Sequence, residues 1–326
     1  MNKPANRLIK LAVMTVAATS LPLAYATDYP SKPIKIVIPY SAGGGTDQFL
    51  RIIAPDISKK LGANIVIDNK PGASTMIGAN AVKTSPPDGY TLVLSTSGTF
   101  SLTPYTIKPK PYEPSEAFDF VGTIGETAMV LSAGPAGPKS FREFVDLAKK
   151  EPGKITYSTS GAGNVSHLAG ELLQKEAGIS LIMVPYKGVE GSTAVAAGHV
   201  NVGIDGESAA GPLISGNKLQ PLAVLQQQRS RTLPDTPALK ELGFPNSTVQ
   251  GIRLVLAAPK GTPENIISKL NAAFTEVLKN PENQKKLESV RTMPLFVGPK
   301  ETGEMLRQQA DVYEEIYKKN GLEFSR

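Results

Sequence analysis

The 326-residue chain has no cysteine, no tryptophan and only two histidines. Without cysteine it cannot form disulfides, zinc–thiolate sites, iron–sulfur clusters or thiol nucleophiles. His167 and His199 are too few for a multi-histidine metal centre. We therefore expect no metal site and no cofactor. The remaining composition, with 40% hydrophobic and 20% charged residues, is typical of an ordinary globular protein.

Long hydrophobic runs are also scarce, and the one near the N-terminus predicts an export signal. Three basic residues precede an apolar run over residues 11–23, which is followed by the signal-peptidase pattern Ala24-Tyr25-Ala26. About 13 apolar residues are too few to cross a bilayer of about 30 Å, which argues against a membrane anchor. We predict that residues 1–26 are a signal peptide cleaved after Ala26, and that the mature protein is periplasmic.

The excess of basic residues is small once this segment is removed. The full chain has 35 Lys and Arg against 29 Asp and Glu, a formal charge of +6. Lys3, Arg7 and Lys10 lie in the predicted signal, which has no acidic residue, so the mature chain keeps 32 against 29 and a charge of +3. So small an excess does not favour a nucleic acid or an anionic membrane as a partner.

Short β-branched runs alternate with helical patterns from residue 28 onward, which is typical of βαβ units and a mainly parallel sheet. We expect strands at residues 34–38, 64–67, 91–95, 129–133, 155–158, 181–184, 200–204, 219–225 and 254–258. In open α/β sheets, ligands bind beyond the carboxyl ends of the strands. The loops that follow the strands are therefore where a functional site is expected.

Two proline-rich segments, residues 103–114 and 234–245, interrupt this pattern. Proline lacks the backbone N–H that helices and sheets need, so each segment is either a surface loop or a crossover between domains. Two crossovers mean that the chain leaves a first lobe, builds a second and returns. We predict a discontinuous first lobe of residues 27–126 and 249–326, and a second lobe of residues 127–248.

Three loops rich in glycine and hydroxyl side chains open helices after predicted strands. They cover residues 39–47, 69–78 and 158–167. Glycine allows close backbone approach and a helix N-terminus offers unpaired N–H groups, so a small anion is the natural guest. The alternative is that they are only tight turns. The third loop resembles a dinucleotide fingerprint, but residues 178–187 lack the acidic residue that would hold a ribose, which argues against a nicotinamide cofactor.

A hydrolase is a second hypothesis, because Ser208 could serve as a nucleophile with His167 or His199 as its base. Asp205 would then orient the base. The segment around Ser208 lacks the second glycine of the GxSxG motif, which weakens this interpretation. An export signal, two lobes and hydroxyl-rich loops without a catalytic set instead favour a binding protein that closes on a small anion.

Five short motifs follow one another along nearly the whole mature chain. They are VIPYSAGGGTD (37–47), DNKPGA (68–73), PPDGYTL (86–92), VPYKG (184–188) and APKGTP (258–263). In this order they resemble the extracytoplasmic receptors of tripartite tricarboxylate transporters, often called the Bug family. The resemblance implies an α/β periplasmic-binding-protein fold of the Venus flytrap kind, similar to type II, with two mixed or parallel sheets and a cleft between two lobes.

The resemblance also implies how the ligand is held. In the family, backbone N–H groups, hydroxyls and ordered waters grip the carboxylate of an organic acid in the cleft, and no reaction follows. By match to the family's motifs, the ligand-binding residues are Tyr40, Ala42, Gly43, Thr46, Asp47, Ser74, Thr75, Ser160, Gly163, His167, Tyr186 and Asp205. The implied partners are large and small integral-membrane permease subunits, and the implied form is a monomer.

The chain departs from the family at two places. Many members have glycines at the positions of Ser74 and Thr75, whose hydroxyls could add donors, and many have tryptophan where Arg253 stands. Arg253 is either a salt-bridged surface residue or a cleft residue that pairs with the second carboxylate of a diacid. Two other functions stay open: a secreted serine hydrolase that uses Ser208 or Ser160, and a ligand-sensing protein for a membrane receptor. The sequence does not identify the carboxylate.

Overall fold

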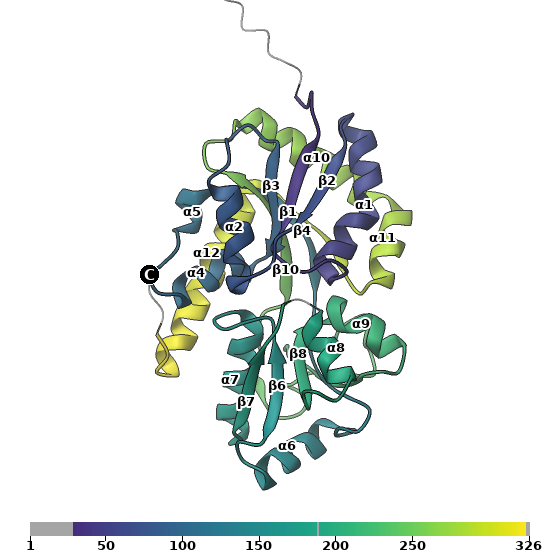
Figure 1. The fold of residues 1–326 in the computed structure, drawn as a ribbon, viewed down its shortest axis with the longest axis vertical. Helices are drawn as coiled ribbons and strands as arrows, with labels where there is room; N and C mark the ends of the chain where they lie inside the picture. Colours follow the sequence, from purple (N-terminus) through teal and green to yellow (C-terminus); the bar gives the residue numbers. More distant parts are fainter. Residues whose placement is uncertain (1–28, 188, 324–326) are drawn as a thin grey trace, which may run out of the picture.

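The computed structural model describes residues 29–187 and 189–323, which form two lobes stacked along the long axis (Figure 1). The predicted signal peptide and its cleavage after Ala26 lie outside the described residues. Each lobe is built on a sheet of its own with helices packed around it. The prediction of a two-lobed α/β fold with two sheets is confirmed.

The first lobe contains a six-stranded mixed sheet in the order β11-β4-β10-β3-β1-β2. Its strands are β1 (Ile34–Ile38), β2 (Ile65–Asn69), β3 (Thr91–Thr96), β4 (Phe118–Thr127), β10 (Ile252–Pro259) and β11 (Met293–Val297). β1 runs parallel to β2 and β3, whereas β10 runs antiparallel to β3 and β4. Around this sheet lie α1 (Gly45–Leu61), α2 (Met76–Lys83), α3 (Gly98–Ser101), α4 (Thr103–Thr106), α5 (Pro114–Ala117), α10 (Glu264–Lys279), α11 (Pro281–Ser289) and α12 (Pro299–Lys319).

The second lobe contains a five-stranded mixed sheet in the order β7-β6-β8-β5-β9. Its strands are β5 (Met129–Ala133), β6 (Ile155–Thr159), β7 (Leu181–Pro185), β8 (Val202–Gly206) and β9 (Gln220–Val224). β6 is parallel to β7 and β8, and β5 is antiparallel to β8 and β9. Its helices are α6 (Phe141–Lys150), α7 (Val165–Ala177), α8 (Glu190–Ala196) and α9 (Glu207–Ser215). Short 3₁₀ turns at Ala73–Thr75 and Pro245–Ser247 complete the structure.

Apolar residues at strand and helix periods explain why these segments pack as they do. In α1 the fully buried Phe49, Ile53 and Ile57 recur every four residues, so they form one face against the first sheet. Gly62 ends the helix in the left-handed conformation, at φ +71°. In the second lobe, Tyr157 is fully buried in β6 beneath α7. Among the described helices, none combines the length and apolar character needed to cross a membrane.

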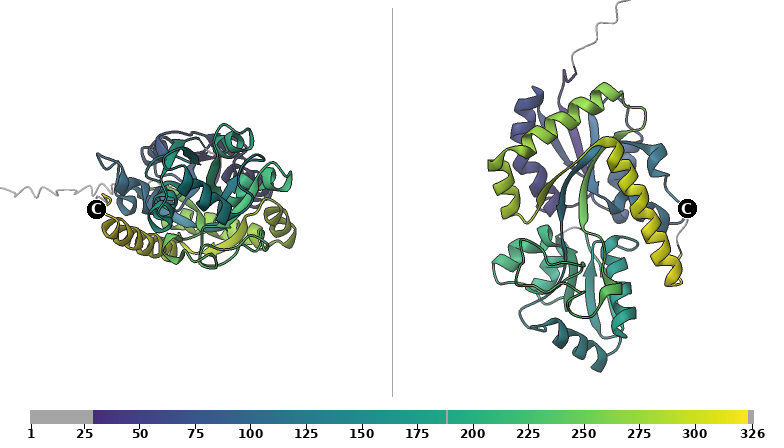
Figure 2. Two further views of the ribbon diagram at one scale, coloured as in Figure 1. Left: turned by 90° about the horizontal axis from the view of Figure 1, so that it is seen from below. Right: turned by 180° about the vertical axis from the view of Figure 1, so that it is seen from behind.

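The chain passes between the lobes where β4 ends at Thr127 and β5 begins at Met129, and it returns between β9 and β10. The proline-rich residues 103–114 are therefore not a crossover. They carry α4 and lead into α5, because proline is tolerated in the first turn of a helix. The C-terminal helix α12 extends from the first lobe along the second (Figure 2). Its Leu306 packs in the first lobe's core, whereas Tyr313 packs in the core of the second.

Candidate functional site

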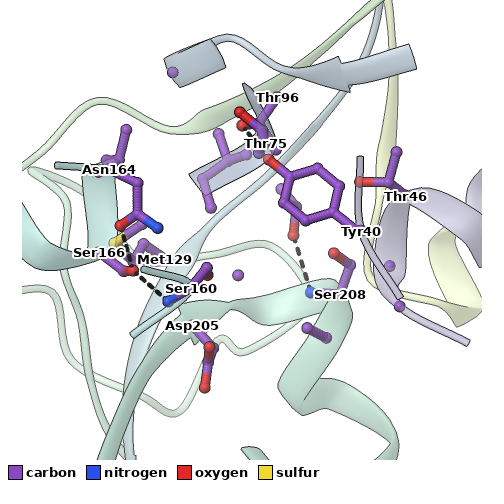
Figure 3. Close-up of a pocket in the computed structure, with 18 of the residues that line it drawn as sticks. Tyr40, Thr46, Thr75, Thr96, Met129, Ser160, Asn164, Ser166, Asp205 and Ser208 are labelled. Atoms are coloured by element: carbon purple, nitrogen blue, oxygen red, sulfur yellow. Dashed lines mark hydrogen bonds between the residues drawn. The ribbon is translucent and has the colours of Figure 1, made fainter. Parts of the chain in front are cut away.

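A cavity of about 90 Å³ lies between the lobes, where loops at the carboxyl ends of β1, β3, β6 and β8 meet (Figure 3). Its lining is rich in hydroxyl groups, which belong to Tyr40, Thr46, Thr75, Thr96, Ser97, Thr99, Thr103, Thr127, Ser160, Ser166 and Ser208. Among the described residues that line it there is no lysine or arginine, and Asp205 has the one ionisable carboxyl. An anion in this cavity would be held by hydroxyls and N–H groups, without a direct ion pair.

The first loop places its third glycine and its threonine at the cavity. Gly44, Gly45 and Thr46 line it, whereas Ala42 and Gly43 are exposed outside it. A Cβ atom at Gly45 would collide with the hydroxyl of Ser208 from the other lobe, so only glycine permits this approach of α1 to α9. Gly45 therefore serves the contact between the lobes as well as the turn.

Asp47 lies behind this loop and is almost fully buried. Its carboxylate accepts hydrogen bonds from the Gly43 N–H (2.9 Å), Arg51 Nε (2.7 Å) and Asn69 Nδ2 (3.1 Å). Burial by itself would raise the pKa of Asp47, but these hydrogen bonds outweigh it and hold the pKa below its usual value. Asp47 does not line the cavity, and its hydrogen bonds are to the loop and its neighbours.

The second loop is strained, because Ala73, Ser74 and Thr75 all have positive φ (44°, 50° and 82°). Thr75 lines the cavity, and its hydroxyl accepts a hydrogen bond from Thr99 at 3.0 Å. Ser74 instead donates to the carbonyl of Ala162 in the opposite lobe at 2.8 Å. The hydroxyls of Ser74 and Thr75 therefore serve two different surfaces.

The third loop is held by its own helix. The carbonyl oxygen of the Asn164 side chain accepts from the His167 N–H at 3.1 Å, which caps α7. The Gly163 N–H donates to Nδ1 of His167 at 3.2 Å, so the imidazole is an acceptor there. Burial lowers the pKa of His167 although Glu171 opposes the shift, so burial favours the neutral ring. Ser160 lines the cavity, whereas Gly163 and His167 do not.

Asp205 lies at the end of β8 and is almost fully buried. Its Oδ2 accepts a hydrogen bond from Ser192 Oγ at 2.8 Å. Burial raises the pKa of Asp205 to about 6, and the hydrogen bond from Ser192 opposes the shift only in part. The carboxyl is therefore close to its midpoint in mildly acidic solution, where its neutral form is a hydrogen-bond donor.

A second cavity of about 270 Å³ adjoins the first and shares Tyr40, Thr75 and Ser160 with it. Ser74 and Tyr186 line this second cavity and not the first. Residues matched to the family's motifs therefore line both of these neighbouring cavities, and Tyr40, Thr75 and Ser160 lie between the two.

Arg253 lies on the side of β10 that faces away from the interlobe cavity. Its neighbours Ile252 and Leu254 line the interlobe cavity, and alternation along a strand points Arg253 the opposite way. It lines a separate cavity behind the lobes. Of the two possibilities left open by the sequence, the structure supports a position outside the interlobe cavity, although no acidic partner lies within 4 Å of Arg253 among the described residues.

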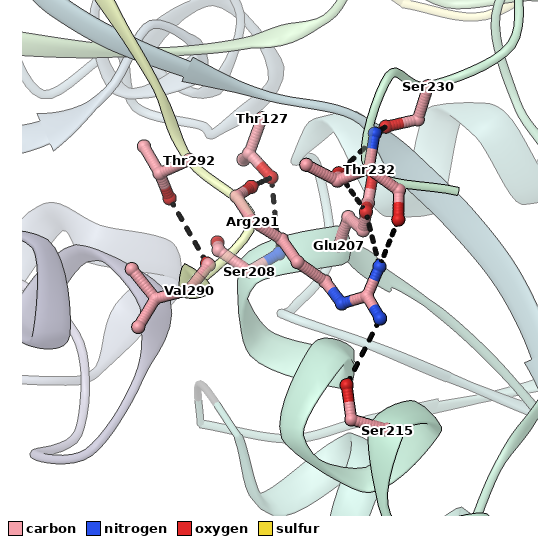
Figure 4. Close-up of polar contacts among 9 residues, drawn as sticks. All are labelled: Thr127, Glu207, Ser208, Ser215, Ser230, Thr232, Val290, Arg291 and Thr292. Carbon is pink, nitrogen blue, oxygen red and sulfur yellow. Dashed lines mark hydrogen bonds and ion pairs between the residues drawn. The ribbon is translucent and has the colours of Figure 1, made fainter. Parts of the chain in front are cut away.

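Hydrogen bonds and an ion pair join the two lobes around the cavity. Besides Ser74, the hydroxyl of Ser41 donates to the carbonyl of Lys187 (3.0 Å), and that of Thr106 donates to the carbonyl of Gly163 (2.9 Å). Beside Ser208, Arg291 reaches across from the first lobe to Glu207 (Figure 4). These contacts define a closed arrangement in which the lobes meet on both sides of the cavity.

Several residues that line the cavity were not among the predicted site residues. Thr96 ends β3, Ser97 and Thr99 follow it, and Thr127 ends β4. The rule that ligands bind beyond the carboxyl ends of strands would have selected the first three, because residues 91–95 were expected as a strand. Thr127 had no such signal, since β4 itself was not predicted.

Comparisons with known proteins agree with this architecture. Residues 49–322 match the model of the tripartite tricarboxylate transporter family receptor. The UPF0065 protein in gbd 5'region of Cupriavidus necator is 32% identical over 317 residues, covering 96% of this chain and 95% of that protein.

Two solved structures extend the similarity to three dimensions. Periplasmic binding protein BugD is 31% identical with a TM-score of 0.84, over 90% of this chain and 99% of that one. Rpa4515 of R. palustris, solved with adipate, is 29% identical with a TM-score of 0.86, over 91% and 99%. The chain therefore belongs to the tripartite tricarboxylate transporter receptor family, the Bug receptors, and is a two-lobed extracytoplasmic solute-binding protein.

Proposed function

We propose that this protein, as a monomer, captures a small organic carboxylate between its lobes and delivers it to a permease with large and small integral-membrane subunits. The observation that carries the proposal is the interlobe cavity itself. Its hydroxyls and its helix N-termini can hold a carboxylate without a cation, because oriented N–H groups supply partial positive charge. The adipate bound by the similar Rpa4515 supports the same ligand class.

Not every residue of the family match has the same role in this proposal. Tyr40, Thr46, Thr75, Ser160 and Asp205 line the cavity and would contact the ligand. The remaining matched residues act through the loops or line the adjoining space: Ala42, Gly43, Asp47, Ser74, Gly163, His167 and Tyr186. A ligand longer than the smaller cavity would extend past Tyr40 into the larger one.

Several finer points belong to the same proposal. Export with cleavage after Ala26 would deliver the mature chain to the periplasm. We place the lobe boundaries at 126/127 and 248/249, near the end of β4 and before the start of β10. Ligand contacts from both lobes would favour the closed arrangement, which the membrane subunits would then recognise.

We further propose that no reaction accompanies binding. Both ring nitrogens of His167 face other groups, since Nδ1 accepts from Gly163 and Nε2 lies 3.6 Å from Glu171. A hydrolase using Ser160 or Ser208 would need a base beside the hydroxyl. Measurable ester turnover that Ser160→Ala or Ser208→Ala abolishes would overturn the receptor proposal.

A sensing role is separable from transport in the cell. Deletion of the gene would abolish carboxylate uptake if the protein serves a permease. Uptake that survives the deletion, together with loss of a transcriptional response, would assign the protein to a membrane receptor instead.

A thermal-shift screen of mono-, di- and tricarboxylates and aromatic acids tests the ligand class. A carboxylate at about 100 times its dissociation constant would add about 2.7 kcal/mol to the free energy of unfolding. The shift should weaken in Thr46→Val, which removes a hydroxyl from the cavity, and persist in Thr193→Val, which removes an exposed one. If no carboxylate shifts the transition, the ligand class is wrong.

A further inference from the structure

The separate cavity that Arg253 lines is polar, has a volume of about 580 Å³ and lies on the side of β10 away from the interlobe cavity. Glu126 and Arg253 contribute from the paired strands β4 and β10, and residues 226–232 contribute from the second lobe. Arg291, which precedes β11, and Tyr313 of α12 also line it. Its size is within the range of small-molecule sites, and an occupant would touch both lobes.

This cavity is strongly basic. Four arginines line it, Arg229, Arg231, Arg253 and Arg291, against the single carboxylate of Glu126. Two of the arginines are already paired outside the cavity. Arg229 lies 2.8 Å from Glu241, and Arg291 lies 3.1 Å from Glu207. Arg231 is exposed at the rim, which leaves Arg253 as the cation in the interior.

Arg253 is partly buried and, within the described residues, its guanidinium has neither an ion pair nor a hydrogen bond to protein. Beside it lies Tyr313, which is 1% exposed and whose hydroxyl has no hydrogen-bond partner. Burial raises the pKa of Tyr313 and the charge of Arg253 opposes the shift, which reflects the proximity of the two groups. A buried hydroxyl without a partner costs free energy unless a ligand or water satisfies it.

We propose that this cavity is a second binding site, for a small molecule that bears a phosphate group. Arg253 supplies a planar fork of donors that matches two phosphate oxygens, and the Tyr313 hydroxyl supplies a further donor from the core side. Arg231 at the rim adds charge that favours a dianion. The cavity is larger than a phosphate group, so it can also hold the organic part of a phosphate ester.

The competing explanation is that Arg253 is the ion-pair partner of Glu126. It lies directly opposite Arg253 in the β4–β10 register, although the two side chains are more than 4 Å apart. If the two side chains pair in solution, Arg253 needs no anion. The two explanations differ in the unaltered chain. An anion site binds phosphate with Glu126 in place, and Glu126→Gln tightens that binding by removing a repulsive charge. A simple ion pair leaves no binding until Glu126→Gln frees Arg253.

Isothermal titration of the mature chain with inorganic phosphate, and separately with glycerol phosphate, tests the site. We expect saturable binding that weakens at least tenfold in Arg253→Gln and about threefold to tenfold in Tyr313→Phe. Arg142→Gln makes the same charge change at an exposed position of α6, and this variant should bind phosphate as the wild type does. Tighter binding of the ester would assign the site to phosphate esters, and equal binding would assign it to free phosphate.

Three results would overturn the proposal: no binding of either probe, binding insensitive to Arg253→Gln, or no gain in Glu126→Gln. The second result would mean that phosphate binds elsewhere on the protein. Thermal unfolding of each variant without ligand verifies that it is folded, so a loss of binding is not mistaken for a loss of structure.

Discussion

Arg291 and Glu207 form an ion pair across the lobes, with Nη1 of the arginine 3.1 Å from Oε1 of the glutamate. The glutamate side chain is fully buried, and its Oε2 has no hydrogen-bond partner. The arginine also donates to the carbonyl of Thr232 and, at 3.1 Å, to the hydroxyl of Ser215 (Figure 4). Gly211 leaves room for it, because a Cβ there would collide with the arginine side chain. This pair joins the loop before β11 to α9 beside the interlobe cavity.

Removing the arginine should therefore destabilise the protein strongly. Arg291→Met leaves the buried charge of Glu207 without a cation, and we expect the free energy of unfolding to fall by about 3–5 kcal/mol. Arg229→Met breaks an exposed pair with Glu241 and should cost much less, because solvent screens the attraction between the two charges. Urea unfolding of both variants measures the difference. Equal losses in the free energy of unfolding would mean that the buried pair stabilises the protein no more than the exposed pair does.

Asp205 should make stability depend on pH in the acid range. Its folded pKa of about 6 lies above the unfolded value of about 3.9, so the folded state binds the proton more tightly. The stabilisation is complete below about pH 4 and is lost as the pH rises through 6, an effect of roughly 3 kcal/mol. Asp205→Asn cannot titrate, so wild type should lose stability relative to this variant between pH 4 and 7. Parallel curves in urea unfolding would contradict the assignment.

The hydrogen bond from Ser74 to the carbonyl of Ala162 should favour the closed arrangement. Ser74→Ala removes it at a cost of about 0.5–1.5 kcal/mol, so the closed-to-open ratio should fall by about 2-fold to 10-fold. Because the chain has no cysteine, Val66→Cys and Ile182→Cys provide one exposed label site in each lobe. Ser289→Ala, an exposed hydroxyl bonded within its own lobe, is the control. If Ser74→Ala leaves the interlobe distance distribution unchanged, the hydrogen bond from Ser74 to Ala162 does not favour the closed arrangement.

Much of the fold could be predicted because buried β-branched runs are visible in the sequence. The strands Ile34–Ile38 and Met129–Ala133 have the predicted bounds. Phe118–Thr127 was missed, since two glycines and a bulged register interrupt its apolar pattern. Met293–Val297 was missed because it is an edge strand that contains proline.

The site was harder to predict than the fold. Loop chemistry indicates where an anion can bind, but it does not show which side chains face inward. Arg253 illustrates this limit, because its direction depends on which face of β10 covers the cavity. His167 illustrates another, since its bond to the Gly163 N–H depends on the exact path of the loop. Ser208 meets Gly45 only because the two lobes close on each other.

The central claim is that a carboxylate closes the two lobes. The most direct measurement is the interlobe distance in the Val66→Cys, Ile182→Cys protein, labelled and titrated with the carboxylate that gives the largest thermal shift. We predict a saturable change to a single short distance in the otherwise unaltered chain, and a higher midpoint concentration in Thr46→Val. A distance distribution that no carboxylate changes would contradict the account.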